Sequence, residues 1–407
     1  MPGSKSVAGG FDLNSRPVFL CDGLRTPFGK YRGGLSGIRT DDLAALTIRQ
    51  LLQRHPLLDL QAIDEVVLGC ANQAGEDNRN VARMAALLAG LPVSVPAFTV
   101  NRLCASGLEA VGLAARAIAV GDADLIIAGG VESMSRAPYI MAKATQPFAR
   151  EQQLEDTTLG WRMINPAMAA AHGVDSMTQT AENLAREFSI SRDDQDAFAL
   201  RSQQRAARAH AAGRWTPELA VVDGLSADEQ PRPDVSLARL QSLAPLLGPD
   251  TSITAGNASG INDGACALII ASEAAVSRWQ LRPRARVLGM SSAGVPPRTM
   301  GIGPVPAIHK LLGRIQHALA DFDRIEINEA FAAQVLAVTR SLGLADDAEH
   351  VNANGGAIAL GHPLGASGAR LALTAMHELD RGSADSAIIS MCVGVGQGAV
   401  LALEATR

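Results

Sequence analysis

A cysteine between a short apolar run and a helical pattern is the first residue able to do chemistry. Cys104 follows Phe98 and Val100 and precedes small and apolar residues at helical spacing as far as Ile118. The pattern predicts a strand-to-helix turn with Cys104 at the helix N-terminus, where free N–H groups and the helix dipole stabilise a thiolate. Residues 105–107 are small and leave room for a substrate carbonyl. Cys104 is therefore a candidate nucleophile, and a small buried core cysteine is the alternative.

A histidine within a glycine-rich stretch is the second candidate. Five glycines lie around His362 in the stretch NGGAIALGHPLGASG, residues 354–368. This density is typical of close backbone approach or of unusual dihedral angles. Pro363 favours an extended backbone at His362, and an apolar helical pattern follows. We expect His362 to act as a general base toward the Cys104 thiol, with an ordinary surface or core histidine as the alternative.

Three further stretches carry polar or reactive side chains beside predicted strands. Cys392 ends an apolar strand and enters the loop VGVGQG, whose backbone N–H groups could bind an oxyanion. That loop lies too near the chain end for a dinucleotide-binding βαβ unit to follow. Asn328 and Glu329 follow the strand 325–327 and could order a water or polarise a carbonyl, or else form a helix N-cap and a first-turn acid. The stretch TAGNASGINDG is a polar loop before an apolar strand, with an ordinary turn as the alternative.

The elements that must position these residues occur twice along the chain. The first series comprises strands from residue 16 and at 63–70, 92–100 and 124–130, with helices from Thr40 and over 80–88. The second series comprises similar segments at 322–330, 351–352 and 385–394. By this repeat His362 falls in the loop that matches the loop of Cys104. We therefore expect two similar α/β halves, packed face to face, with mixed sheets covered by helices.

A region of different composition separates the two series, from about residue 134 to residue 261. It is richer in charge and in Met, Gln and Pro, and it contains a predicted helix over 192–212 with Ser191 as its N-cap. We expect an insertion into the first half, where a bulky substrate could be held.

Composition restricts the class of protein. The 407 residues are 47% hydrophobic and 19% charged with a formal net charge of -5, which favours a soluble globular protein over a nucleic-acid binder. The five cysteines are dispersed, so no metal site and no disulfide framework is indicated, and Cys21, Cys70 and Cys266 are expected in the core. No stretch approaches a membrane span, and residues 1–15 are expected to be a flexible tail without a secretory signal. A reducing cytoplasm is the expected compartment.

Five motifs resemble those of the thiolase family and occur in the same order: VNRLCASG, TAGNASGIND, INEAFA, NGGAIALGHPLGASGAR and MCVGVGQG. The resemblance extends from about residue 17 to the end of the sequence. It implies an α/β thiolase fold of two βαβαβαββ halves, a layered α/β/α/β/α core and an inserted loop domain. The implied parts are the tail 1–15, a first half of 16–133 and 262–283, a loop domain 134–261 for CoA binding and oligomer contacts, and a second half of 284–407. A homo-oligomer, dimer or tetramer, and ping-pong Claisen chemistry on CoA thioesters are also implied.

The same resemblance implies roles for residues at matching positions. Cys104 takes the acyl group, His362 activates it and helps bind the thioester oxygen, and Cys392 moves the proton at the acyl α-carbon or on the leaving CoA thiol. Asn328 positions a catalytic water, and the backbone N–H groups of Cys104 and Gly394 form an oxyanion hole. The residues implied in CoA and substrate contact are Ala258 and Ser259 in the pantetheine loop, Ala330 and Phe331 along the tunnel, and Met177 and Met300 near the acyl pocket. Ser176 stands where the family usually has a histidine. CoA and acyl-CoA are substrates, and no cofactor or metal is implied.

Several stretches resemble in particular the thiolases that cleave 3-oxoadipyl-CoA in aromatic-compound degradation, among them CANQAGEDNRNVARMA and LEDTTLGWRMINP. The products would be succinyl-CoA and acetyl-CoA, and the carboxylate of the acyl tail would need a cation or several donors where it is buried. Arg162, or a nearby polar group of the loop domain, is our hypothesis for that contact, and a surface or subunit-contact arginine is the alternative.

Three rival functions remain. A general acetyl-CoA acetyltransferase or a 3-ketoacyl-CoA thiolase of fatty-acid metabolism would use the same catalytic residues. A ketosynthase would use a Cys-His-His set, against which Cys392 and the Asn-Glu-Ala-Phe motif argue. A non-catalytic CoA or lipid carrier is expected to have lost reactive groups, whereas Cys104, His362 and Cys392 are all present.

Overall fold

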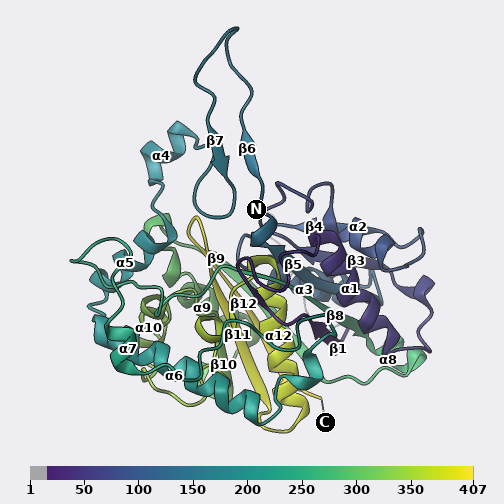
Figure 1. Ribbon diagram of the computed structural model, residues 1–407. Coiled ribbons are helices and arrows are strands. Elements are labelled where there is room, and N and C mark those ends of the chain that lie inside the picture. Colours follow the sequence, from purple (N-terminus) through teal and green to yellow (C-terminus); the bar gives the residue numbers. More distant parts are fainter. Residues whose placement is uncertain (1–15, 407) are drawn as a thin grey trace, which may run out of the picture.

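The computed structural model describes residues 16–406, so the predicted tail 1–15 lies outside the described part of the chain. The main sheet contains β1 (Val18–Arg25), β2 (Gly29–Lys30), β3 (Glu65–Gly69), β4 (Ala97–Val100), β5 (Leu125–Ser133), β8 (Asn262–Ser272), β9 (Ala285–Gly294), β10 (Arg324–Ile327), β11 (Ser386–Val393) and β12 (Gln397–Ala405). These form one ten-stranded sheet in the order β10-β11-β12-β9-β1-β8-β5-β3-β4, with β2 beside β8 (Figure 1).

The two sides of this sheet have the same strand order, which confirms the repeat predicted from the sequence. In the first half β3 pairs in parallel with β4 and β5, and β8 pairs antiparallel with β5 and β1. In the second half β10 pairs in parallel with β11 and, at one bridge, with Val351, while β12 pairs antiparallel with β11 and β9. The halves also meet at an edge, because Phe19 and Leu20 of β1 pair with β9. The sequence pattern did not predict this junction.

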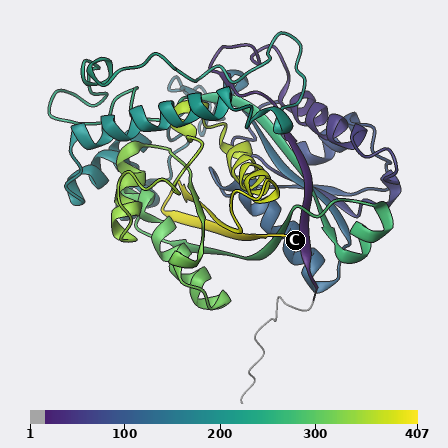
Figure 2. The same ribbon diagram turned by 90° about the horizontal axis from the view of Figure 1, so that it is seen from below.

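Helices cover the sheet in layers. α1 (Thr40–Gln53) and α2 (Val81–Leu88) pack on the outer face of the first half, and α9 (Pro304–Ile315) and α10 (Ala332–Ser341) pack on that of the second. Between the halves lie α3 (Ser106–Val120) and α12 (Leu364–Asp380), which share one hydrophobic cluster with strands of both halves. Figure 2 shows α12, in yellow, near the centre of the molecule. This is the layered α/β/α/β/α core expected from the sequence.

The N-terminal ends of α3 and α12 approach each other closely. A Cβ atom on Gly107 would lie 2.4 Å from the carbonyl oxygen of Gly365, and one on Gly368 would lie 2.4 Å from the backbone nitrogen of Leu108. Only glycine permits such an approach of two backbones. Cys104 and His362 each lie just before the first turn of one of these helices. The glycine contact therefore brings the two reactive loops together.

The region between β5 and β8 lies outside the repeat. It contains β6 (Tyr139–Met141), β7 (Leu154–Asp156), α4 (Pro166–His172), α5 (Met177–Glu187), α6 (Arg192–Ala211) and α7 (Leu237–Gln241). β6 and β7 pair antiparallel and project from the body at the top of Figure 1. Ser191 caps α6 as predicted, because its side chain accepts a hydrogen bond from the backbone N–H of Asp194.

The remaining described elements are short connections: α8 (Glu273–Trp279), α11 (Ala357–Leu360) and the 3-10 turns Leu60–Ala62, Met134–Arg136, Thr216–Glu218, Pro297–Ile302 and Leu319–Asp321. One expectation about apolar segments needs correction. The stretch Leu103–Val120, essentially α3, is long and apolar enough to cross a membrane by length and composition alone, but 67% of it is buried. The central position of α3, packed between strands of both halves of the sheet, explains its apolar character.

Candidate active site

Cys104 lies in a tight turn at the start of α3, as the sequence predicts. Ser106 closes this turn: its Oγ accepts from the backbone N–H of Arg102 at 2.9 Å and donates to the carbonyl of Leu103 at 2.6 Å. Two backbone N–H groups, those of Gly394 and of Cys104 itself, favour the thiolate, but burial outweighs them and raises the pKa of Cys104 to about 11. The predicted stabilisation at the helix end is present, yet the resting sulfur is a thiol because desolvation of the anion is the larger effect.

His362 lies at the start of α12 with both ring nitrogens in contact with polar side chains. Its Nδ1 lies 2.6 Å from Ser367 Oγ, and that hydroxyl donates to the carbonyl of Pro363 at 3.0 Å. Ser367 Oγ therefore accepts from Nδ1–H, which leaves Nε2 unprotonated and facing Asn328 Nδ2 at 3.3 Å. Burial, together with the positive charge of Arg370, lowers the pKa of His362 to about 3. His362 is thus a neutral imidazole with a free electron pair on Nε2.

Cys392 lies at the end of β11 and is buried beside Cys104. Burial above all raises the pKa of Cys392, and a thiolate at the neighbouring Cys104 would raise it further, so the resting form of Cys392 is also a thiol. Cys392 shares a hydrophobic cluster with all the apolar residues that the sequence assigned to CoA and acyl contact, namely Met177, Ala258, Met300, Ala330 and Phe331. The structure therefore brings the second reactive cysteine and the predicted acyl-CoA contacts into one place.

Asn328 and Glu329 follow β10 but face different surroundings. Asn328 Nδ2 reaches His362, while its Oδ1 is buried and has no hydrogen-bond partner among residues 16–406. Glu329 accepts hydrogen bonds from Ser202 Oγ at 2.6 Å, Asn352 Nδ2 at 2.9 Å and the backbone N–H of Ile358 at 3.1 Å. Glu329 therefore ties α6 to the loops before α12, whereas Asn328 faces the reactive groups. The N-cap alternative is wrong, because α10 begins at Ala332 after Phe331.

The loop that carries Ala258 and Ser259 is held against the second half. The backbone N–H of Ser259 donates to the carbonyl of Ala330 at 3.0 Å, and Ala258 forms a β-bridge with Phe331. This loop is therefore more than an ordinary turn, because its residue Ala258 packs against the hydrophobic cluster that contains Cys392.

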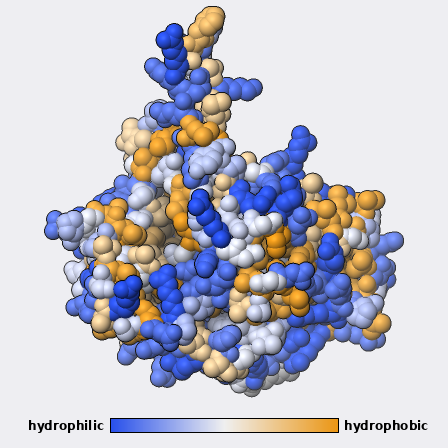
Figure 3. Space-filling view, viewed as in Figure 1, coloured by the Kyte–Doolittle hydropathy of each residue, from blue (hydrophilic) through white to orange (hydrophobic). Residues whose placement is uncertain are grey.

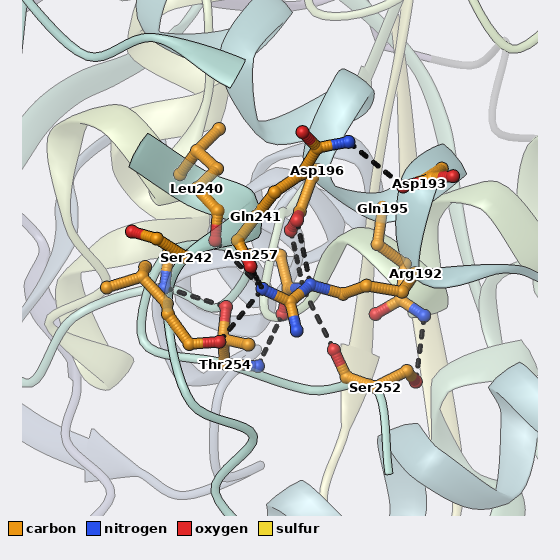
Figure 4. Close-up of polar contacts among 12 residues, drawn as sticks. Arg192, Asp193, Gln195, Asp196, Leu240, Gln241, Ser242, Ser252, Thr254 and Asn257 are labelled. Atoms are coloured by element: carbon orange, nitrogen blue, oxygen red, sulfur yellow. Dashed lines mark hydrogen bonds and ion pairs between the residues drawn. The ribbon is translucent and has the colours of Figure 1, made fainter. Parts of the chain in front are cut away.

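The side chains of Arg192 and Asp196, on α6, hold that loop in place through Asn257 (Figure 4). Asn257 donates to Asp196 Oδ1 and to the carbonyl of Ser252, each at 3.1 Å, and accepts from the backbone N–H of Thr254 at 2.8 Å. Arg192 in turn pairs with Asp196 at 2.7 Å. The inserted region thus positions the predicted pantetheine loop through a buried polar network.

Glu132, at the end of β5, was missed by the sequence reasoning. Its carboxylate accepts from the backbone N–H groups of Ala71 and Asn72, each at 3.0 Å, and of Gly365 at 2.9 Å. Burial raises the pKa of Glu132 to about 7 despite these donors. An acidic residue near the end of the otherwise apolar strand LIIAGGVES could have indicated Glu132 from the sequence. Glu132 joins a loop of the first half to the first turn of α12.

Glu132 also belongs to the one group of described residues spaced to hold a metal ion. Ligand atoms of Cys70, Asp77 and Glu132 lie within 4.8 Å of one another. Both oxygens of Glu132 already accept backbone hydrogen bonds, so we assign this group a structural role.

Two other predicted contacts lie in the inserted region. Ser176, at the position where a histidine was expected, caps α5 by accepting from the backbone N–H of Gln179 at 3.1 Å. Arg162 is half-buried in the loop between β7 and α4. Neither position contradicts the sequence-based roles, and neither supplies a contact to Cys104.

The sequence analysis also missed a pocket near the pantetheine loop that two arginines line. It measures about 360 Å³ and is lined by Arg232, Asp234 and Arg239, and by the apolar residues Pro233, Val235, Leu240 and Leu243. A Cβ atom on Gly260 would lie 2.8 Å from the side chain of Gln230, so the segment leading to Arg232 borders the Ser259 loop. Two arginines, Arg232 and Arg239, in the predicted insertion could have indicated this pocket from the sequence.

Comparisons with known proteins agree with this arrangement. The thiolase N-terminal domain model matches residues 18–274, and the thiolase C-terminal domain model matches residues 281–405. A beta-ketoadipyl-CoA thiolase of Pseudomonas knackmussii is 62% identical over 96% of this chain and 99% of its own length, and one of Pseudomonas aeruginosa is 61% identical over the same shares. The crystal structure of human mitochondrial 3-ketoacyl-CoA thiolase in complex with CoA has a TM-score of 0.89 at 40% identity, over 96% of this chain and 98% of that one. This chain belongs to the thiolase family.

Proposed function

We propose that this thiolase cleaves 3-oxoadipyl-CoA with CoA to give succinyl-CoA and acetyl-CoA. Cys392 lies beside Cys104, and the contact of Gly107 with Gly365 brings the loop of neutral His362 to that of Cys104; this arrangement carries the chemical part of the proposal. The similarity to beta-ketoadipyl-CoA thiolases supports the choice of substrate.

The first half-reaction uses Cys104 as the nucleophile. His362 Nε2, which holds a free electron pair, takes the thiol proton as Sγ attacks the 3-oxo carbonyl. The C2–C3 bond then breaks, the acyl group stays on Sγ, and the Cys392 thiol gives its proton to the acetyl-CoA carbanion. In the second half-reaction the Cys392 thiolate takes the proton of the CoA thiol, and the CoA sulfur attacks the acyl-Cys104 thioester. The bond between the acyl group and Sγ breaks, succinyl-CoA leaves, and the protonated His362 returns its proton to the Cys104 sulfur.

The negative charge that develops on the carbonyl oxygens during both half-reactions needs hydrogen-bond donors close to Cys104. The N–H groups of Gly394 and Cys104 face the sulfur and suit the oxyanion of the acyl-cysteine. Nε2 of His362, once protonated, becomes a donor for the thioester oxygen. The buried Oδ1 of Asn328 supports the proposed role in holding a water there.

Recognition of CoA is proposed to involve the arginine pocket beside the Ser259 loop. Arg232 and Arg239 can pair with phosphate groups of CoA, which neutral residues of the acyl cluster cannot. Arg232→Ala should raise the KM for CoA more than the KM for pantetheine, which lacks the nucleotide. An equal change in both would place this pocket outside the CoA site.

The acyl carboxylate separates this proposal from the rival thiolase functions. The test compares kcat/KM for thiolysis of 3-oxoadipyl-CoA, acetoacetyl-CoA and a medium-chain 3-oxoacyl-CoA. A preference of about a hundredfold for 3-oxoadipyl-CoA corresponds to about 2.7 kcal/mol of transition-state discrimination and supports recognition of the carboxylate. A flat profile leaves a general acetyl-CoA acetyltransferase or fatty-acid thiolase. Arg162→Ala with an intact preference would remove Arg162 from the proposal.

We also propose a homo-oligomer in the cytoplasm. β4 ends the main sheet, and beside it a pocket of about 300 Å³ is lined by Phe98, Leu113 and Val120. Figure 3 shows apolar surface on the side that carries α2 and β4 and on the projecting hairpin. Such an edge favours pairing with a second copy. A monomeric mass by light scattering would refute the oligomer, and a reducing cytoplasm suits the free thiols.

A further inference from the structure

One residue next to the reactive centre has a backbone conformation that its side chain opposes. Val395 lies in the turn between β11 and β12 with φ 62°, and among residues 16–406 it is the only β-branched residue with positive φ. The Cβ branch makes this region unfavourable for valine, whereas glycine and asparagine adopt it readily. Gly394 and Gly396 flank it. The turn therefore keeps a valine where its backbone favours glycine.

Core packing does not account for this valine. Val395 is 38% exposed, and it belongs to none of the hydrophobic clusters formed by the described residues. Gly396 differs, because a Cβ atom there would lie 2.1 Å from the carbonyl oxygen of Val295. Only glycine fits at position 396, whereas a side chain at position 395 is tolerated and stays partly exposed. Strain of this kind persists mainly at functional sites.

The position of Val395 relative to Cys104 indicates what it contacts. The N–H of the preceding residue, Gly394, faces the Cys104 sulfur. A Cβ atom on Gly394 would lie 3.1 Å from Leu103 Cδ1 and 3.9 Å from Met177 Sδ. Leu103, just before Cys104, also has positive φ, at 46°. Two strained apolar residues, one from each half, thus flank the point where the acyl group is attached.

We propose that Val395 is a specificity-determining residue that contacts the methylene segment of the acyl chain beyond the 3-oxo group. This rests on the proposed function, because the acyl group must be attached to Cys104 with its oxygen near Gly394 N–H. Consecutive Cα atoms are about 3.8 Å apart, so Val395 follows directly on the N–H that faces the Cys104 sulfur, within reach of the first carbons of that chain. An acetyl group has no methylene to meet it, whereas succinyl and longer acyl groups do.

The test compares Val395→Gly and Val395→Thr with the unmodified enzyme in thiolysis of acetoacetyl-CoA and 3-oxohexanoyl-CoA. Glycine removes both the strain and the apolar contact, while threonine keeps the branch and the strain but replaces a methyl group with a hydroxyl. The ratio of kcat/KM for 3-oxohexanoyl-CoA over acetoacetyl-CoA should fall about tenfold in Val395→Gly, as expected for a lost methylene contact. It should also fall, by a smaller factor, in Val395→Thr. Val395→Gly should melt no lower than the unmodified protein.

Three results would overturn the proposal. An unchanged ratio in both variants means that no acyl contact exists. A loss of equal size for both substrates means that the residue only shapes the turn that carries Gly394. A fall in the melting temperature of Val395→Gly means that the side chain stabilises the fold. Because neither substrate carries a distal carboxylate, failure of the 3-oxoadipyl-CoA assignment is seen separately, as a flat profile of the unmodified enzyme.

Discussion

Replacing Ser367 with alanine tests whether one hydrogen bond sets the tautomer of His362. Ser367 is fully buried, and its Oγ lies 2.6 Å from His362 Nδ1 while donating to the carbonyl of Pro363. Without Oγ, either Nδ1–H stays buried and unpaired, at a cost of about 1–3 kcal/mol, or the ring changes tautomer and loses its free Nε2 electron pair. Since about 1.36 kcal/mol corresponds to a factor of ten in rate, kcat/KM should fall about five- to 160-fold.

Thiolysis of acetoacetyl-CoA is the assay, and Ser367→Thr should restore activity because threonine keeps the hydroxyl. Ser272→Ala is the matched control: Ser272 is also buried, and its Oγ lies 2.7 Å from Asp124 Oδ1 at the N-cap of α8. That variant should lose stability but keep its kcat/KM. Full activity in a folded Ser367→Ala protein would refute the tautomer argument. An equal loss in Ser272→Ala would show that activity follows stability alone.

Three further predictions concern the same site. Burial and Arg370 lower the pKa of His362 from 6.5 to about 3, so the stability gained from the neutral ring is present above pH 6.5 and is lost as the pH falls toward 3. In urea unfolding, His362→Asn should flatten this dependence by up to about 1.36 kcal/mol per pH unit, and an unchanged slope would contradict the buried neutral state. Mass spectrometry with acetyl-CoA should detect acyl-enzyme in Cys392→Ser but not in Cys104→Ser, and Cys392→Ser should lose about a hundredfold or more in kcat for thiolysis; normal turnover there would exclude the acid–base role. Asn257→Ala should raise the KM for CoA with little change in kcat, because the pantetheine loop loses its anchor, and an unchanged KM would show that the loop holds without it.

Local signals explain why much of the fold could be predicted from the sequence. Alternating strand and helix patterns, and a matching order of segments near Cys104 and His362, predicted two similar halves. The cap residues Asn80 and Ser191 stand where the predicted helices begin. Motif glycines predicted close backbone contact, and Gly107 and Gly365 form that contact between α3 and α12. These features depend on neighbours along the chain, so a single sequence contains them.

The sequence by itself determined the reactive residue types, their places at element ends and the order of the two halves. Only the tertiary structure decided their electrostatic state, because burial depends on neighbours from distant segments: desolvation makes Cys104 a thiol and His362 a neutral base. The tertiary structure also separated Asn328, which faces His362, from Glu329, which holds three other segments. The same holds for Glu132 and for the strained Val395, since neither three backbone donors nor a positive φ can be read from residue types. Patterns along a chain predict which groups are present, whereas packing between its halves sets their charge, orientation and strain.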